Sequence, residues 1–477
     1  MQVQSMFFKR NASMKLDDAV LQRNMKNAKG KFVDGRARGI AEVDNWEAIR
    51  THAAALRDRT LENLDAFLVE FEANATRRGA KVHWAETAEE ACRILVEIAK
   101  ANGVKKVTKS KSMVSEEVNL NERFAEAGVE VIETDLGEYI LQLAGEPPSH
   151  IVAPAVHKSK EQVADLFTEA HHKPRSTDIP ALTKEAREAL RGHFLTADMG
   201  VSGANFVVAE TGTTLTVTNE GNADMVTTLP RIHCVITGIE KVIPTLEDFA
   251  TLIRLLPRSA IGQSIANYLT LTTGVKGRGD VDGPEQMHIV LVDAGRTRFV
   301  GTELQSMLRC IRCGACMNHC PVYQNIGGHA YGWVYPGPMG SVLTPVYVGI
   351  ENAGDLPNAA TFCGECAVVC PVKIPLPDLM RKLREKQFDL HLRPWGERAA
   401  IRLWGFAVRR PRLYAALASI GARAAAWMGG RDRIIRRLPG LDGWTHGRDM
   451  PAPEGRTFRE MYRKRALAAS REGTARP

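Results

Sequence analysis

The sequence predicts an α/β domain with a mainly parallel, buried sheet, followed by a small helical cysteine-rich domain and a basic helical tail. Three observations support this order. Short apolar runs alternate with helical patterns from about residue 80 to 300, seven of nine cysteines lie between residues 310 and 370, and Lys and Arg dominate the last fifth of the chain. Such alternation of strands and helices is typical of α/β domains with parallel sheets.

The first 44 residues form a largely polar stretch without regular apolar spacing, so we expect an irregular N-terminal arm. A helical pair follows, in which apolar residues recur at helical spacing from Leu61 to Ala75. Thr60 is a candidate N-cap, and Gly79 ends the run. Two later stretches also have helical spacing: AEEACRILVEIAKANG (88–103) and TLEDFATLIRLL (245–256).

Five apolar runs rich in β-branched residues predict strands of the sheet. They are VEVIETD (129–135), NFVVAE (205–210), TLTVTNEG (214–221), HCVITG (233–238) and HIVLVDAG (288–295). The α/β domain is therefore expected at residues 45–300, the cysteine-rich domain at 301–380 and the tail at 381–477. Between Pro321 and Pro345, the many glycines and prolines predict a loop rather than an extended helix.

Two cysteine runs carry the clearest chemical signal. CIRCGACMNHCP (310–321) has the spacing C-x2-C-x2-C-x3-C-P, and FCGECAVVCP (362–371) repeats its last three cysteines. This is the ferredoxin-type spacing for [4Fe–4S] clusters, in which the fourth cysteine of a run ligates the other cluster. The spacing therefore predicts two clusters, the first held by Cys310, Cys313, Cys316 and Cys370 and the second by Cys320, Cys363 and Cys366.

The second cluster lacks one cysteine, because the expected position holds Ala360. Three interpretations remain: a three-iron cluster, a four-iron cluster with an oxygen, nitrogen or solvent ligand, or a cysteine from the α/β domain. The candidates are Glu365, His319 and His329 for the second interpretation and Cys92 and Cys234 for the third. Zinc prefers closed four-coordinate sites and fits seven shared cysteines poorly. Paired clusters with no nucleophile or base pattern nearby predict electron relay rather than catalysis.

A second candidate site lies in the α/β domain, where polar residues gather at predicted strand ends. Ligands of open α/β sheets usually bind at such ends. The candidate ligand-binding residues are Lys109, Lys111, Glu210, Gly212, Asn219 and Glu220. A simple hairpin turn explains Glu210, Gly212, Asn219 and Glu220 equally well. For Lys109 and Lys111, a solvated basic loop is the commoner explanation. GVKGRGDVDG (274–283) has Asp282 where a dinucleotide motif needs its third glycine, so no dinucleotide site is predicted.

Composition and charge restrict the class of protein further. Apolar residues make up 44% and charged residues 25% of the 477 residues, as in globular proteins. Residues 381–477 contain 23 Lys and Arg against 9 Asp and Glu, so the tail has a net charge of +14. The net charge of the whole chain is +8, so residues 1–380 carry a net charge of −6. No apolar run reaches 18 residues and no signal peptide is evident, so we expect a cytoplasmic protein.

Several longer stretches resemble the lactate-utilisation iron–sulfur family, and specifically its B-subunit members. They are KSKSMVSEEVNLN (109–121), ETDLGEYILQL (133–143), PSHIVAPAVHK (148–158), GVSGANFVVAETGT (200–213), TNEGNADMVTTLP (218–230) and GIEKVIP (238–244). The cysteine runs and the basic tail also lie where that family has them. The resemblance covers the chain from about residue 45 onward.

The resemblance implies an iron–sulfur electron-transfer subunit that works with two partner proteins to oxidise L-lactate to pyruvate. It implies two [4Fe–4S] clusters on the seven cysteines named above, so the three-cysteine run is the family's own pattern. It also implies an α/β fold like that of coenzyme-A transferases and sugar-phosphate isomerases. Catalytic residues are not assigned, and we expect electron transfer rather than substrate turnover by this chain alone.

The basic tail interleaves arginines with aromatic and aliphatic residues, from Arg402 to Arg437. Such helices dock partner proteins or lie on anionic membrane surfaces. We favour partner docking, then peripheral contact with the inner face of the cell membrane, then plain solvated helices that cover the cysteine-rich domain. We expect no nucleic-acid binding, because no binding motif accompanies the charge. Alternative functions are a relay for another 2-hydroxy acid or a thiol–disulfide couple, and an acyl- or phosphosugar-handling enzyme with ancillary clusters.

Overall fold

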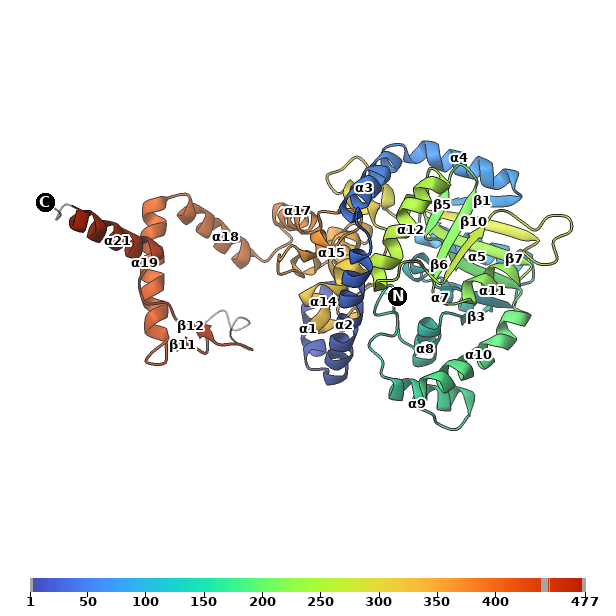
Figure 1. Cartoon of the computed structure of the whole chain (residues 1–477), viewed down its shortest axis with the longest axis horizontal. Coiled ribbons are helices and arrows are strands. Elements are labelled where there is room, and N and C mark those ends of the chain that lie inside the picture. The colour runs from blue at the N-terminus through green and yellow to red at the C-terminus, as the bar shows by residue number, and fades with distance from the viewer. Residues whose placement is uncertain (1–2, 439–444, 446, 474–477) are drawn as a thin grey trace. The chain divides into compact units, whose positions relative to one another are not determined.

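A computed structural model of the chain describes residues 3–438, 445 and 447–473, with side chains described as far as residue 467 (Figure 1). The chain forms two compact units, Met1–Gln387 and Phe388–Pro477. The first unit contains the segments 1–44, 45–300 and 301–380 that the sequence distinguishes, and the second contains most of the tail. The domain boundaries inside the first unit stay a prediction.

A six-stranded sheet forms the centre of the α/β part. Its strand order is β1 (Ala80–Ala85), β10 (Gln286–Val292), β7 (Ile232–Gly238), β4 (Met199–Gly203), β2 (Lys106–Lys109), β3 (Glu130–Glu133). Every neighbouring pair is parallel, which confirms the predicted α/β class. All seven residues of β7 are buried, as expected for a strand covered on both faces. Three strands of this sheet were not predicted (β1, β2 and β4), because lysine or glycine residues interrupt their apolar pattern.

Different helices cover the two faces of this sheet (Figure 1). Alternate residues of β10 divide between two apolar clusters: Val290 packs in one and Ile289 in the other. On the first face lie α5 (Ala88–Ala101), α6 (Met113–Glu117) and α7 (Leu120–Glu126). On the second lie α4 (Leu64–Arg77) and a smaller sheet. A separate cluster joins α8 (Leu136–Ala144), α9 (Lys160–His171), α10 (Ile179–Thr196) and α11 (Asn222–Thr228).

The smaller sheet corrects one expectation, since two of the predicted strands do not join the parallel sheet. Its order is β8 (Val242–Ile243), β5 (Phe206–Val208), β6 (Thr213–Thr218), β9 (Tyr268–Thr272). The strands predicted at 205–210 and 214–221 are β5 and β6, which pair antiparallel. Only residues 209–212 connect them, and a parallel crossover needs a dozen or more residues.

The N-terminal segment is helical, so the predicted irregular arm was wrong. It forms α1 (Phe8–Leu16) and α2 (Ala19–Ala41), and the Asp18 side chain accepts a hydrogen bond from Leu21 N at 2.9 Å as the N-cap of α2. Helix α2 packs along α12 (Leu246–Ile261) at Gly35 and Gly39. A Cβ atom at Gly39 would lie 2.5 Å from the carbonyl oxygen of Gly262, so this contact requires glycine. The glycines that hid the helical pattern are therefore what allows the helix to pack.

Two further local predictions need correction. Thr60 caps no helix, because it lies inside α3 (Trp46–Glu62) and donates a hydrogen bond to Leu56 O at 2.9 Å. The helix break falls at Asn63 instead, whereas Gly79 follows α4 with a positive φ of 87°, as predicted. Between the cysteine runs, the expected loop contains α14 (Pro321–Ile326) and α15 (Gly337–Tyr347). Pro338 is tolerated in α15 because a first-turn N–H has no helical partner.

The remaining helical elements lead into the second unit. They are α13 (Ala315–Asn318), α16 (Glu365–Val368), α17 (Leu376–Asp389), α18 (Trp395–Val408), α19 (Pro411–Met428) and α21 (Phe458–Gly473), with a short ladder of β11 (Ile434–Ile435) and β12 (Met450–Pro451). A break before Pro411 separates α18 from α19. Among the described residues, no helix combines the length and apolarity needed to cross a membrane.

Candidate functional site

The two cysteine runs fold into matching turns. Arg312 and Phe362 stand directly before a cysteine with positive φ values of 59° and 57°, and Gly314 and Gly364 follow that cysteine with φ values of 77° and 86°. Each turn then starts a one-turn helix, α13 or α16. In this repeat Cys313 corresponds to Cys363, so the position that matches Cys310 is Ala360. The second turn therefore lacks a thiol at the position that the sequence identified.

The structure brings the seven cysteines together as two neighbouring groups. Cys313 interacts electrostatically with Cys310 and Cys370. Cys316 interacts with Cys310, Cys313 and Cys370. Cys320 interacts with Cys363, and Cys366 interacts with both. Cys316 also interacts with Cys366, which links the two groups. Each group contains one cysteine from the other run, which is the arrangement of paired ferredoxin-type sites.

The chemistry of these donors fits iron–sulfur clusters. Burial raises the pKa of Cys313 and Cys366 to about 12 and that of Cys370 to about 11, so the free thiols would be protonated. Metal coordination deprotonates such thiols outright. Backbone N–H groups are already directed at the sulfurs, with Arg312 N 3.4 Å from Cys310 Sγ and Ile374 N 3.4 Å from Cys370 Sγ. Hydrogen bonds to sulfur help to set the potentials of such clusters.

A network of buried cations surrounds Cys310. Arg296 forms two hydrogen bonds with Glu117 at 2.8 and 2.9 Å and one with Glu240 at 2.6 Å. Arg57 donates to Leu308 O at 3.1 Å, and Lys241 donates to Cys310 O at 3.3 Å.

The network holds more positive than negative charge. Its four cations (Arg57, Lys241, Arg296 and Arg312) face two buried carboxylates (Glu117 and Glu240). Buried charge needs a counter-charge, and thiolate ligands at Cys310 and its neighbours would supply it. This network was not predicted from the sequence.

The N-terminal helices hold the second cysteine run by its backbone. Arg36 of α2 donates to Val369 O at 2.9 Å. Arg50 of α3 donates to Val368 O at 2.7 Å and to Cys370 O at 2.6 and 3.1 Å. These arginines satisfy carbonyl groups at the end of α16, where helical partners are missing. The segment predicted as an arm is therefore part of the wall around the cysteines.

A cavity of about 560 Å³ lies at the carboxyl ends of the parallel strands. Strands β2 and β4 are neighbours, but the chain continues from β2 toward β3 on one side and from β4 toward β7 on the other. Ligands of open α/β sheets bind at this kind of switch point. Lys111 and Ser112 follow β2, Gly203 is the last residue of β4, and all three line the cavity. On its other side the cavity is lined by Arg312, Cys313 and Tyr335.

Charged groups of the cavity have shifted pKa values. Burial and the nearby Asp135 raise the pKa of Glu220 to about 7. Burial and the Arg312 charge lower the pKa of Lys241 to about 7. Burial alone would raise the pKa of Glu240, but Arg296, Lys241 and Arg312 outweigh it and lower the pKa to about 2. The cavity lining near Cys313 therefore carries three basic side chains (Lys111, Lys241 and Arg312) and three acidic ones (Asp135, Glu220 and Glu240).

The candidate ligand residues of the α/β domain divide into two sets. Lys111, Asn219 and Glu220 line the cavity. Lys109 is buried beneath it between Glu116 and Glu133, at 2.6 and 2.8 Å, and these carboxylates raise its pKa although burial alone would lower it. Glu210 accepts a hydrogen bond from Leu246 N at 2.6 Å, and Gly212 packs on the backbone of Ala75. Lys109, Glu210 and Gly212 are not among the cavity-lining residues.

The candidate fourth ligands of the second cluster lie in different surroundings. His319 bonds to Ala315 O of its own helix at 2.9 Å and interacts electrostatically with Glu365. His329 bonds to Pro147 O at 2.8 Å. Cys92 and Cys234 belong to an apolar cluster of the sheet that contains none of the seven clustered cysteines. Cys363 is exposed, so solvent can reach this side of the second group.

Comparisons with known proteins cover almost the whole chain. Residues 68–292 match the family described as the LUD domain, residues 306–374 the 4Fe-4S dicluster domain, and residues 381–467 the C-terminal family of lactate utilisation protein B. The cysteine runs therefore form an iron–sulfur domain. A DUF162-family crystal structure from Deinococcus radiodurans matches 48% of this chain and 98% of that chain, with 14% identity and a TM-score of 0.28.

Full-length relatives have closely similar sequences. Lactate utilization protein B of Lysinibacillus sphaericus (strain C3-41) is 44% identical over 461 residues, which are 96% of this chain and 97% of that protein. The uncharacterized electron transport protein YkgF of Escherichia coli (strain K12) is 40% identical over 98% of both chains. Lactate utilization protein B of Bacillus velezensis is 42% identical over 98% of both chains. The chain therefore belongs to the lactate utilisation protein B family.

Proposed function

We propose that this chain is an iron–sulfur electron-transfer subunit in the oxidation of L-lactate to pyruvate. Its relatives are named for lactate utilisation, and one is named an electron transport protein. The single observation that carries the proposal is the shared wall between the strand-end cavity and the first cysteine turn, where Cys313 lines the cavity. A small molecule in this cavity would lie against a cluster ligand.

The cavity offers groups that suit a 2-hydroxy acid. Lys241 and Arg312 supply positive charge for a carboxylate. Glu240 Oε1 is buried without a hydrogen-bond partner among the described residues, so it can accept a hydrogen bond from a hydroxyl group. Lys111, Asn219 and Glu220 belong to the same site, whereas we assign Lys109, Glu210 and Gly212 supporting roles.

Seven cysteines would hold two [4Fe–4S] clusters: Cys310, Cys313, Cys316 and Cys370 the first, and Cys320, Cys363 and Cys366 the second. Such clusters accept and release single electrons. The exposure of Cys363 supports the second group as the outer one, because Cys363 is the exposed member of the seven cysteines. Electrons from the cavity would therefore leave near Cys363. The fourth ligand of the second cluster is assigned to solvent or to Glu365.

We propose two partner subunits, because the resemblance implies a three-part system. The C-terminal unit is suited to docking one of them. Arginines alternate there with large side chains that are exposed over most of their surface, Trp395 at 79% and Trp427 at 84%. Interfaces are enriched in Trp and Arg. We place the complex in the cytoplasm. The alternative role for the same helices is peripheral contact with the cell membrane.

Electron paramagnetic resonance of the anaerobically co-purified complex tests the proposal. We expect L-lactate to produce signals of reduced clusters, whereas glycolate and D-lactate produce none. Dithionite serves as the control, because it reduces the clusters without a substrate site. Signals with dithionite but none with L-lactate would overturn the lactate proposal, and signals with glycolate would point to another 2-hydroxy acid.

A further inference from the structure

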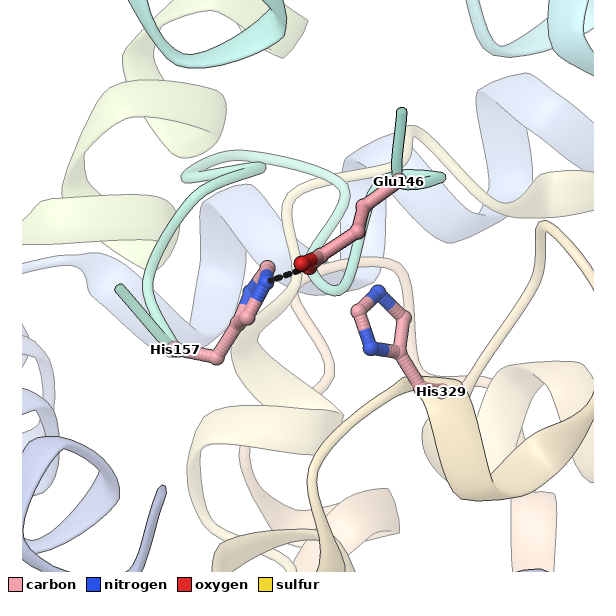
Figure 2. A group of neighbouring side chains, drawn as sticks. All are labelled: Glu146, His157 and His329. Carbon is pink, nitrogen blue, oxygen red and sulfur yellow. Dashed lines mark hydrogen bonds and ion pairs between the residues drawn. The ribbon is translucent and has the colours of Figure 1, made fainter. Parts of the chain in front are cut away.

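A second group of potential ligands lies apart from the cysteines. Glu146, His157 and His329 each direct one ligand atom toward a common point, and these atoms lie within 4.8 Å of one another (Figure 2). Glu146 and His157 belong to the loop between α8 and α9, whereas His329 belongs to the segment between the cysteine runs. Within the described residues this is the one such group of three.

The distances suit a single metal ion. His157 Nε2 lies 2.8 Å from Glu146 Oε2. Imidazole nitrogens and carboxylate oxygens bind zinc at about 2.0–2.2 Å, so two neighbouring ligands of one ion are about 3 Å apart. The His157 and His329 rings meet edge to face, with centroids 4.6 Å apart. Small side-chain rotations are therefore enough to place all three atoms around one ion.

Hydrogen bonding leaves the histidine nitrogens available. His329 Nε2 lies 2.8 Å from Pro147 O, and a carbonyl oxygen only accepts, so Nε2 carries the proton and Nδ1 has a free lone pair. A metal-bound histidine usually donates its other ring N–H to a carbonyl or carboxylate oxygen, as His329 does to Pro147 O. His157 Nδ1 is buried without a partner among the described residues. A move of the His157 proton from Nε2 to Nδ1 frees Nε2 for a metal without any net loss of charge.

The surroundings fix the carboxylate and leave room for further ligands. Lys158 pairs with Glu146 Oε1, which orients the carboxylate and leaves Oε2 for the metal. A hydrogen-bonded carboxylate is typical of metal ligands. The three residues also line a cavity of about 590 Å³, together with Lys15, Asp18 and Gln162. Three protein ligands beside a cavity match an open metal site, in which water or a small ligand completes the coordination.

We propose that Glu146, His157 and His329 bind one divalent first-row transition-metal ion at a site separate from the iron–sulfur cysteines. Two neutral imidazoles and one carboxylate are a ligand set for zinc, iron(II) or manganese(II). The ion joins the loop that precedes α9 to the segment between the cysteine runs. The proposal does not depend on lactate as the substrate.

Equilibrium dialysis of the cluster-loaded protein against Zn²⁺ tests this site. We expect one zinc ion per chain in the wild type, and at least tenfold weaker binding in Glu146→Gln and in His329→Gln, because loss even of an outer-shell partner costs about 10–100-fold in affinity. His171→Gln is the matched control. His171 pairs with Glu185 at the same 2.8 Å but belongs to no three-ligand group among the described residues. Its zinc binding should equal that of the wild type.

Iron and sulfide content shows whether each variant keeps its clusters. If a variant loses them, X-ray absorption of zinc on the wild-type protein decides the question without any substitution. Nitrogen and oxygen ligands alone would support the site, whereas sulfur ligands would show that zinc binds the cysteines and overturn it. Equal zinc affinity in the wild type and both cluster-loaded variants, or no zinc bound by the wild type, would also overturn it.

Discussion

Lys241 donates a hydrogen bond to the backbone carbonyl of Cys310, with 3.3 Å between Nζ and the oxygen. Lys241 follows the central strand β7, and Cys310 opens the first cysteine run. The bond therefore joins the carboxyl end of the sheet to the proposed first cluster. It also places a buried cation beside a cluster ligand, since the Lys241 side chain is only 6% exposed.

Substitution of this lysine should change the reduction potential of the first cluster. A nearby positive charge stabilises the reduced, more negative state. Below pH 7, where Lys241 is protonated, Lys241→Met should therefore lower the potential by about 59 mV, which corresponds to a tenfold change for one electron. A redox titration followed by electron paramagnetic resonance measures this. Lys276→Met is the control, since that lysine pairs with Glu285 at 3.3 Å in an exposed region. Equal shifts in both variants would contradict the prediction.

Arg296 should be essential for stability. It is fully buried and pairs with Glu117 and Glu240. Arg296→Met leaves two buried carboxylates without their partner, so the free energy of unfolding should fall by about 3–5 kcal/mol. Anaerobic urea unfolding followed by tryptophan fluorescence measures the loss. Arg93→Met breaks an exposed pair with Glu97, which solvent screens, and should leave the free energy of unfolding almost unchanged. Similar losses in the two variants would refute the special role of Arg296.

Cysteine substitutions should reveal ligands exchanged between the runs. Cys370→Ser lies in the second run but should remove the same cluster as Cys313→Ser, because the two thiols belong to one group. Cys363→Ser should remove the other cluster. Iron analysis should show a loss of about half in each variant, and the magnetic interaction between reduced clusters should vanish. Cys92→Ser should retain all the iron. Loss of different clusters in Cys370→Ser and Cys313→Ser would refute the assignment.

Glu220 should give the protein a specific pH dependence. Burial and Asp135 raise its pKa from 4.5 to about 7. The folded protein then holds a proton that the unfolded chain has already released, so this contribution to stability falls as pH rises from 4.5 to 7 and stays constant above. Glu220→Gln should remove this dependence and gain about 1–2 kcal/mol at the upper end, allowing for partial exposure.

Urea unfolding at several pH values measures the effect of Glu220. The difference in free energy of unfolding between the wild type and Glu220→Gln should change steadily from pH 4.5 to pH 7 and stay constant above pH 7. Glu285→Gln is the control, because Glu285 forms an exposed pair with Lys276. Parallel curves for the wild type and Glu220→Gln would show that Glu220 titrates as it does in the unfolded chain.

The exposed tryptophans of the C-terminal unit should control association. Trp395, Trp404 and Trp427 are 79%, 64% and 84% exposed. Their joint substitution by Asp should abolish co-purification of the partner subunits while the cluster spectra stay unchanged. Unchanged co-purification would refute docking through this surface. Sedimentation with anionic lipid vesicles distinguishes membrane contact from partner docking. If the protein binds vesicles but not the partner subunits, membrane contact becomes the favoured role of this surface.

Local features of the chain could be predicted because each depends on a few neighbouring residues. The spacing of Cys310, Cys313 and Cys316 suits one tight turn, whatever the rest of the chain does. The apolar strands β7 and β10 and the amphipathic helix α5 likewise follow from residue periodicity. Periodicity failed for α2, whose glycines suggest a flexible segment until their contact with α12 is known.

The candidate site was predicted only in part. Lys111, Asn219 and Glu220 meet at the cavity, whereas Glu210 bonds to the start of α12 and Gly212 packs on the backbone of α4. All of these residues stand near strand ends in the sequence. Which strand end faces the cavity depends on the order of strands in the sheet, and strand order follows from long-range pairing rather than from residue type.

The sequence by itself determined the α/β class, the iron–sulfur turns and the charge of the tail, because periodicity, cysteine spacing and composition are local properties. Only the tertiary structure decided which distant side chains meet. Arg296 and Glu117 are 179 positions apart, and His329 and Pro147 are 182 apart. Such pairs form only when apolar burial brings their segments together, because the free energy that fixes them comes from the whole core rather than from the residues that meet.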